Sequence, residues 1–106
     1  MENSDIAIKA TAFSDENRVK ILKMLATKEL CGCNILEYLG ISQPTLSYHM
    51  RLLTESGLVC ARRSGKWTYY SLNMPEFSAL REALDEVVQT KIQDLPDLNC
   101  EEISSN

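Results

Sequence analysis

The sequence has no long run of apolar residues and no recognisable export signal. None of its hydrophobic segments approaches the roughly 18 residues that a membrane helix needs. Residues 1–5 lack the basic and then apolar pattern of a signal peptide. Internal repeats and low-complexity tracts are absent as well. We therefore expect a cytoplasmic protein with no membrane partner, and its 106 residues with 44% hydrophobic content predict one compact domain.

The context of the cysteines argues against a disulfide framework. The chain has four cysteines, and a cytoplasm keeps thiols reduced, so we interpret them as ligands, redox-active groups or core residues. The sequence places no base near these thiols and contains no pocket motif, which argues against a thiol enzyme or carrier. We expect a protein that is not an enzyme.

Basic charge is also limited, but it is concentrated in one segment. The net charge is -4, which is unfavourable for a nucleic-acid-binding protein if it is spread evenly. Residues 45–75 carry four basic and one acidic side chain, whereas residues 76–106 carry two basic and eight acidic ones. A locally basic segment is what DNA binding requires, even in an acidic protein.

The spacing of apolar residues predicts two helices in the N-terminal part of the chain. The first is short and ends before Ser14 and Asp15, which are suited to cap the next helix. The second spans about residues 15–27. Its inward stripe includes Val19 and Leu22, and Arg18 lies on another face.

A helix-turn-helix motif is predicted next. A short helix spans about residues 31–39 and stops at Gly40, because glycine adopts left-handed backbone geometry without strain. Ser42 then caps a longer helix, which ends at Gly57. A short helix, a tight glycine-containing turn and a second helix form this motif.

After residue 57 the apolar period changes from helical to extended. Residues 58–63 and 67–72 flank a short glycine-bearing loop, a pattern that predicts a β-hairpin, which we interpret as a wing. Pro75 precedes a strongly periodic helix whose apolar stripe we expect to extend from Phe77 to Leu95. Two interpretations of this stripe stay open, a core helix and a dimerisation helix that pairs with the first helix.

The predicted fold class is mainly α with a small β-hairpin, a winged helix-turn-helix in the order α-α-α-α-β-β-α. Residues 1–95 form the DNA-binding domain with dimerisation helices at both ends. The polar and acidic residues 96–106 are expected to form a flexible tail. The expected partners are operator DNA and a second copy of the chain.

The candidate DNA-binding residues lie on the fourth predicted helix and in the hairpin. Glutamine can pair with adenine, arginine with guanine or phosphate, and hydroxyl groups position the DNA backbone. His49 lies at the edge of the buried stripe. Its position there is equally consistent with a packed side chain and with a DNA contact. The basic cluster of the hairpin predicts phosphate or minor-groove contacts. The candidates are Gln43, Thr45, Ser47, Tyr48, His49, Arg51, Arg62, Arg63 and Lys66.

Cys31 and Cys33 are the candidate metal ligands. They lie where a helix begins, and exposed backbone amides there favour the thiolate form. Residues two positions apart on a helix point about 200° away from each other. We therefore expect that the first turn of the helix must deform before both cysteines can bind one ion. Cys60 on the first hairpin strand is expected to be a small core residue, with a third-ligand role as the alternative. Cys100, in the tail, is either a third ligand or an idle thiol.

Three stretches of the sequence resemble the ArsR/SmtB family of metal-responsive repressors. Residues 13–22 are similar to the opening of the family's second helix. Residues 42–50 are similar to its recognition helix and continue into residues 55–59 as family members do. Residues 29–33, Glu-Leu-Cys-Gly-Cys, resemble the Cys-x-Cys box of the arsenic- and cadmium-sensing branches. The resemblance covers nearly the full length. It implies a dimeric repressor that releases operator DNA when a metal or metalloid binds the box.

Departures from the family pattern narrow the choice of inducing ion. Leu36 occupies the position where one type of arsenic sensor has a third cysteine, and no cysteine precedes Cys31 as in cadmium and lead sensors. Zinc-type members use Asp and His pairs on the last helix, but the only histidine here is His49. The resemblance therefore implies arsenite or antimonite, bound by Cys31 and Cys33, with no organic cofactor. A cadmium-, lead- or bismuth-responsive repressor and a thiol-redox-responsive repressor of the same fold remain alternatives.

Overall fold

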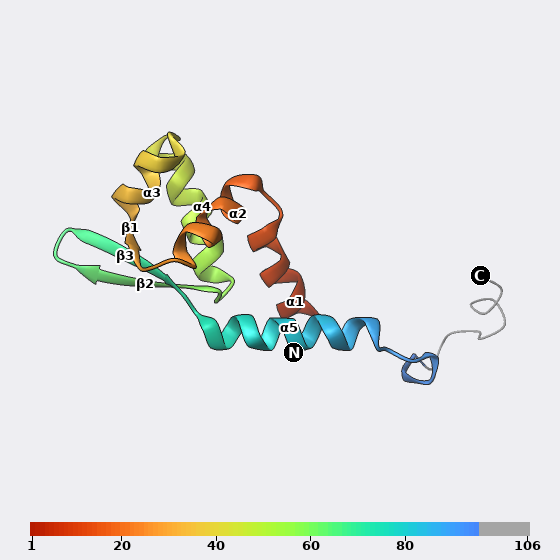
Figure 1. The fold of residues 1–106 in the computed structure, drawn as a ribbon. Coiled ribbons are helices and arrows are strands. Elements are labelled where there is room, and N and C mark those ends of the chain that lie inside the picture. Colours follow the sequence, from red (N-terminus) through yellow and green to blue (C-terminus); the bar gives the residue numbers. More distant parts are fainter. Residues whose placement is uncertain (96–106) are drawn as a thin grey trace.

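Helices make up most of the chain, and a small antiparallel sheet extends from one side (Figure 1). The computed structural model describes residues 1–95. The predicted winged helix-turn-helix fold is confirmed, with one strand more than expected. The elements are α1 (Asn3–Ala10), the 3-10 helix η1 (Thr11–Phe13), α2 (Glu16–Leu25), β1 (Leu30–Cys31), α3 (Gly32–Leu39), α4 (Gln43–Glu55), β2 (Val59–Ser64), β3 (Trp67–Leu72), α5 (Met74–Val88) and the 3-10 helix η2 (Ile92–Asp94).

Local signals in the sequence define the helix ends. The Asp15 carboxylate accepts a hydrogen bond from the backbone amide of Asn17 at 2.8 Å and so caps α2. Ser42 caps α4 in the same way. Gly40 ends α3 with a φ of 64°, a left-handed conformation that favours glycine. These caps confirm the predicted start of α2, the stop of α3 and the start of α4.

The sheet has the strand order β1-β3-β2, and both strand pairs are antiparallel. Strand β1 pairs Leu30 with Tyr70 and Cys31 with Tyr69. The sequence did not predict this strand, because two residues are too short to show an alternating pattern. The hairpin of β2 and β3 reaches away from the helices (Figure 1), and Gly65 lies in its tight turn with a φ of 61°.

The hydrophobic core lies where α2, α3 and α4 meet the base of the sheet. Its buried side chains come from η1, α2, α3, α4, α5 and the first residues after α4, whereas α1 contributes none. Several of them are fully buried. Burial of such aliphatic side chains is the main favourable term in folding. The core residues are Ala12, Ile21, Leu22, Leu25, Ile35, Leu46, Met50, Leu53, Leu58, Val59 and Leu80.

Arg18 corrects the predicted orientation of α2. It was expected on an outer face, yet it is buried, and Ile21 takes the inward position that we assigned to the half-buried Val19. The Arg18 Nε donates to the carbonyl oxygen of Thr11 at 2.9 Å, and its Nη2 donates to the Ser14 hydroxyl at 2.9 Å. A buried guanidinium is tolerated when its donors have partners.

Helix α5 lies beneath α1 (Figure 1). The ion pair between Lys9 and Glu76 (3.3 Å) joins α1 to α5, and the edge-to-face contact of Phe13 with Phe77 joins η1 to α5. The helix ends at Val88, so the apolar stripe predicted to reach Leu95 is too long.

Helix α5 has a buried side and an uncovered apolar side. Leu80 and Ala83 are buried, whereas Leu84, Val87 and Val88 are 50%, 53% and 81% exposed. The uncovered apolar side of α5 is defined by these last three residues. None of the helices in residues 1–95 combines the length and the apolar character needed to cross a membrane.

Replacement of Arg18 by alanine is expected to lower the free energy of unfolding by about 2–4 kcal/mol, because the buried His49 ring and two part-buried oxygen acceptors lose a charged donor. Urea unfolding followed by circular dichroism measures the change. Lys20→Ala, on the exposed side of the same helix, is the control and should change stability by less than about 0.5 kcal/mol. Equal midpoints for the two variants would contradict the structural role of Arg18.

Candidate DNA-binding surface and cysteine site

The polar face of α4 consists of five exposed residues, Gln43, Thr45, Ser47, Tyr48 and Arg51. Gln43 Nε2 donates to the Ser47 hydroxyl at 3.4 Å, and the Arg51 guanidinium lies 5.4 Å from the centre of the Tyr48 ring. Arg51 also forms an exposed ion pair with Glu55 at 3.6 Å. An exposed ion pair with one contact at this distance is weak, so Arg51 remains available to a phosphate or a base edge.

His49 does not belong to this polar face. It follows Leu46 by three positions and is 5% exposed, so it faces the core rather than solvent. The Arg18 Nη1 lies 2.9 Å from His49 Nδ1. Because a guanidinium has only donors, Nδ1 accepts, and the ring proton sits on Nε2, which lies 3.9 Å from the Asp15 carboxylate. Of the two interpretations, the packed histidine is therefore the one that the structure supports.

Asp15, which faces His49, is also the cap of α2. The pKa of its carboxyl lies below the ordinary value, mainly because the Asn17 backbone amide donates to it. The charged form of Asp15 is thus the one that the fold favours. Arg18, His49 and Asp15 together connect α2 to the inner side of α4.

The wing residues Arg62, Arg63 and Lys66 are all exposed. Lys66 Nζ lies 5.2 Å from the centre of the Trp67 ring, a cation–π contact at the tip of the hairpin. A cleft of about 380 Å³ separates the wing from the polar face of α4. It is lined by Gly32, Cys33, Leu36, Gln43, Leu46, Ser47, Met50, Arg63, Lys66, Trp67, Thr68 and Tyr70.

Arg62 has a partner that no sequence pattern indicates. Its Nη2 donates to Glu29 Oε1 at 2.8 Å and its Nε donates to Glu29 Oε2 at 3.3 Å, while the guanidinium lies 4.8 Å from the centre of the Tyr69 ring. The hydrogen bond from Arg62 holds the pKa of Glu29 below its usual value. The residues are 33 positions apart, and only the pairing of β1 with β3 brings them together.

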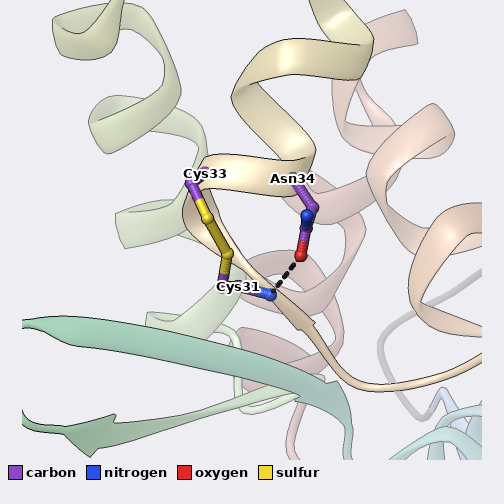
Figure 2. The surroundings of a disulfide bond; sticks show 3 residues. All are labelled: Cys31, Cys33 and Asn34. Carbon is purple, nitrogen blue, oxygen red and sulfur yellow. Dashed lines mark hydrogen bonds between the residues drawn. A yellow bond between two sulfur atoms is a disulfide. The ribbon is translucent and has the colours of Figure 1, made fainter.

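Cys31 and Cys33 meet at the start of α3, where a disulfide bond joins them (Figure 2). This corrects two expectations, that the cysteines are free thiols and that they point apart. Cys31 is the last residue of β1 and precedes the helix, with extended angles (φ -80°, ψ 156°), whereas Cys33 is the second residue of α3. The helical separation of 200° therefore does not apply, and the two sulfur atoms meet without deformation of the helix.

The surroundings of the cysteine pair, Cys31 and Cys33, differ on its two sides. The Cys31 backbone amide donates to Asn34 Oδ1 at 3.2 Å, which fixes the strand-to-helix corner (Figure 2). Cys31 is 7% exposed, and Cys33 is exposed and lines the cleft beside α4. A group bound to Cys33 therefore lies close to the polar face of α4.

The described residues supply two soft donors rather than three. Within residues 1–95, no cluster of three His, Cys, Asp or Glu side chains is suited to hold a metal ion. Cys60 is exposed, which corrects its expected place in the core, because it follows the buried Val59 and faces the other side of β2. Strand β3 separates it from Cys31, a distance of roughly 10 Å across the sheet. Cys100 lies outside the described residues.

Comparison with known proteins agrees with this architecture. The model of a family described as "Bacterial regulatory protein, arsR family" matches residues 15–60, which extend from the cap of α2 into β2. The arsenical resistance operon repressor of Staphylococcus xylosus is 36% identical over 93 residues, which cover 88% of each chain. The chain belongs to the arsR family. It is therefore a transcriptional regulator and not an enzyme.

Two further relatives support this assignment. The arsenical resistance operon repressor of Escherichia coli K12 is 39% identical to this arsR-family chain over 101 residues, which cover 88% of this chain and 86% of that one. A solved homodimeric winged helix-turn-helix domain of Mycobacterium bovis, Mb0332, is described as a possible ArsR-family transcriptional regulator. It superposes with a TM-score of 0.66 at 28% identity and covers 81% of this chain and 80% of that one.

Replacement of Arg63 or Lys66 by alanine is expected to weaken binding to specific and random DNA about equally, because phosphate contacts carry no sequence information. The slope of log K against log salt should fall by about 0.9 for each lost contact. Fluorescence anisotropy at several salt concentrations measures both quantities. Arg81→Ala, an exposed arginine on α5, is the control and should leave the slope unchanged. Wild-type slopes in both wing variants would refute the wing contact.

Proposed function

We propose that this arsR-family protein is a metal(loid)-responsive repressor that binds operator DNA as a homodimer and releases it when arsenite or antimonite binds Cys31 and Cys33. The observation that carries the proposal is the meeting of the two sulfur atoms at the corner between β1 and α3. A trivalent, thiol-seeking ion needs thiolate donors that converge in this way, so a cellular thiol must first reduce the disulfide with two electrons and two protons. The arsenical resistance repressors among its relatives support the choice of ion.

The DNA-binding surface is proposed to combine the polar face of α4 with the wing. A recognition helix of this motif enters the major groove, and its N-terminal residues contact base edges. Gln43 and Arg51 supply the side chains that can read bases, and Thr45, Ser47 and Tyr48 can position the phosphate backbone. Arg63 and Lys66 on the wing then contact the neighbouring backbone.

Release of DNA follows from the place of the cysteine pair. Cys31 is the residue on which α3 begins, and Cys33 shares a cleft with Gln43 and Ser47 of α4. An ion held by both sulfur atoms therefore acts on the helix that precedes the recognition helix and fills space beside it. By linkage, the factor by which the ion weakens DNA binding equals the factor by which DNA weakens ion binding.

The candidate ions differ in their affinity for soft ligands such as thiolates. Two thiolates favour arsenite, antimonite, cadmium, lead and bismuth over oxygen-seeking metals, and the single buried histidine offers no help to zinc. We place the protein in the cytoplasm, where thiols are kept reduced and able to bind such ions. A titration of operator release with each ion ranks the candidates by function.

A thiol-redox response is a second candidate function, and the disulfide of the structure favours it. A peroxide would oxidise the two thiols, with release of two electrons and two protons, and would itself be reduced to water. Mass spectrometry after mild peroxide treatment reports the loss of two hydrogens. Two results together would assign the protein to this candidate function. Peroxide would release the operator, and arsenite, added under reducing conditions, would not.

Serine at Cys31 or Cys33 is expected to leave the fold and the affinity for operator DNA intact and to abolish release by arsenite, because an alcohol lacks the soft donor. The repressor then stays bound at every arsenite concentration. Mobility shift with increasing arsenite, under reducing conditions, measures release. Cys60→Ser is the matched control and should respond like the wild type. Release from both Cys31→Ser and Cys33→Ser at the wild-type arsenite concentration would place the sensor elsewhere.

Glutamate at Leu84 or Val88 is expected to split the proposed dimer, because it places charge on the uncovered apolar side of α5. Operator affinity should fall on the order of 100-fold, since two half-sites about 34 Å apart need linked recognition helices. Sedimentation velocity measures the mass, and anisotropy measures the affinity. Tyr38→Glu replaces another exposed apolar residue and should remain dimeric. A dimeric Val88→Glu protein, or a monomeric wild type, argues against this interface.

A further inference from the structure

The outer side of the sheet carries a charged cluster that links the cysteine segment to the wing. Glu29 lies immediately before β1, two residues from Cys31, and its carboxylate makes two hydrogen bonds to the Arg62 guanidinium on β2. A pairing of this fork-shaped type is geometrically specific. It occupies the Nε donor and one Nη2 donor of Arg62, which form one of the two sides by which a guanidinium binds a phosphate with paired hydrogen bonds.

The strand pairing fixes the position of Glu29 relative to the wing. Cys31 pairs with Tyr69 on β3, and Tyr69 pairs with Arg62 on β2, so the three residues form one row across the sheet. The Arg62 guanidinium lies over the Tyr69 ring as well. Because β1 contains only Leu30 and Cys31, a change at the Cys31 sulfur acts on an element that begins one residue after Glu29.

We propose that Glu29 is a positioning residue that withholds Arg62 from the DNA backbone when Cys31 and Cys33 are joined, and that it frees Arg62 when they are apart. This inference rests on the proposed function as a DNA-binding repressor. The structure contains the joined cysteine pair and the occupied Arg62 together. Joining the cysteines, by a disulfide or a shared ion, ties Cys31 to the first turn of α3 and so holds β1 and Glu29 against the sheet.

The proposal divides the wing into two parts. Arg63 and Lys66 line the cleft beside α4, and neither takes part in the ion pairs of residues 1–95. Arg62 is the wing cation whose availability depends on the cysteine pair. One additional phosphate contact is worth about fivefold in affinity at 0.15 M salt, from a slope of about 0.9 per contact. The cysteine pair thus adjusts the strength of DNA binding through sequence-independent contacts.

The test compares the oxidised and the reduced protein on random DNA. Cys60→Ser/Cys100→Ser protein is used, so that the only thiols are Cys31 and Cys33. Diamide accepts the two electrons and two protons of these thiols to form the disulfide, and dithiothreitol restores them. The salt slope should be about 0.9 smaller in the oxidised protein, and the affinity at 0.15 M salt about fivefold lower.

The Glu29→Gln variant should bind with the larger slope in both states, because its amide does not hold the guanidinium against phosphate. Glu37→Gln removes the same charge from the exposed face of α3 and should behave like the parent protein. With Arg62→Gln added, Glu29→Gln should have no effect in either state. The proposal would be overturned if Glu29→Gln did not change the salt slope, or if it changed the slope equally in the oxidised and the reduced protein. It would also be overturned if the change persisted in a protein that carries Arg62→Gln.

This experiment is independent of the inducing ion. If Cys31→Ser and Cys33→Ser still release operator with arsenite, the proposed sensor site is wrong, yet the slopes on random DNA still decide the role of Glu29. If arsenite release behaves as expected and the slopes of the oxidised and reduced proteins agree, the role of Glu29 is wrong and the proposed function stands.

Discussion

The buried guanidinium of Arg18 fixes the arrangement on which the DNA-binding surface depends. It binds the end of the N-terminal segment at Thr11 and Ser14 and the inner side of α4 at His49. The desolvation of a charged side chain is costly, so this position is stable only while all three partners are in place. The orientation of α4, and therefore the direction in which its polar face points, is set by a contact on the opposite side of the helix.

The corner between β1 and α3 is the second constraint. A strand of two residues contributes little stability of its own, but it places Cys31 at the start of a helix and Glu29 beside the wing. A Cβ at Gly32 would meet the Tyr70 ring at 3.5 Å, an ordinary van der Waals contact, so β3 packs closely against this corner. The cysteine pair, the wing and the first turn of α3 are thus neighbours in one small region.

The sequence was sufficient for the fold, and it singled out the residues of the candidate site, which remain a prediction. Caps at Asp15 and Ser42 and the glycine stop at Gly40 are local signals, and the apolar period identified the helices and the hairpin. The sequence-based prediction failed where contacts between distant parts of the chain determine the position of a side chain. Arg18 has the chemistry of a surface residue and is buried because it bonds to Thr11 and Ser14 nearby and to His49, 31 positions away. The partner of Arg62 lies across a strand pairing too short to predict.

The predicted directions of the two cysteine side chains were wrong for a different reason. The prediction assumed that both residues belong to the helix, so that their directions follow the helical repeat. Cys31 instead has the extended backbone of a cap, and one residue of non-helical geometry is enough to bring the two sulfur atoms together. A helix boundary predicted from sequence can be displaced by one or two residues. Here the displacement falls on Cys31, which precedes the helix instead of belonging to it.

Under the proposed function, the unequal exposure of Cys31 and Cys33 would make capture of an ion by the reduced pair an ordered, two-step process. An arriving ion meets the exposed Cys33 first, and the rate of that encounter depends on the cleft beside α4. Closure onto the buried Cys31 is then intramolecular, so it benefits from a high effective concentration and excludes water from one sulfur. Departure requires the reverse order, with the shielded bond broken first. Residence time is therefore governed by Cys31, and the speed of detection by Cys33.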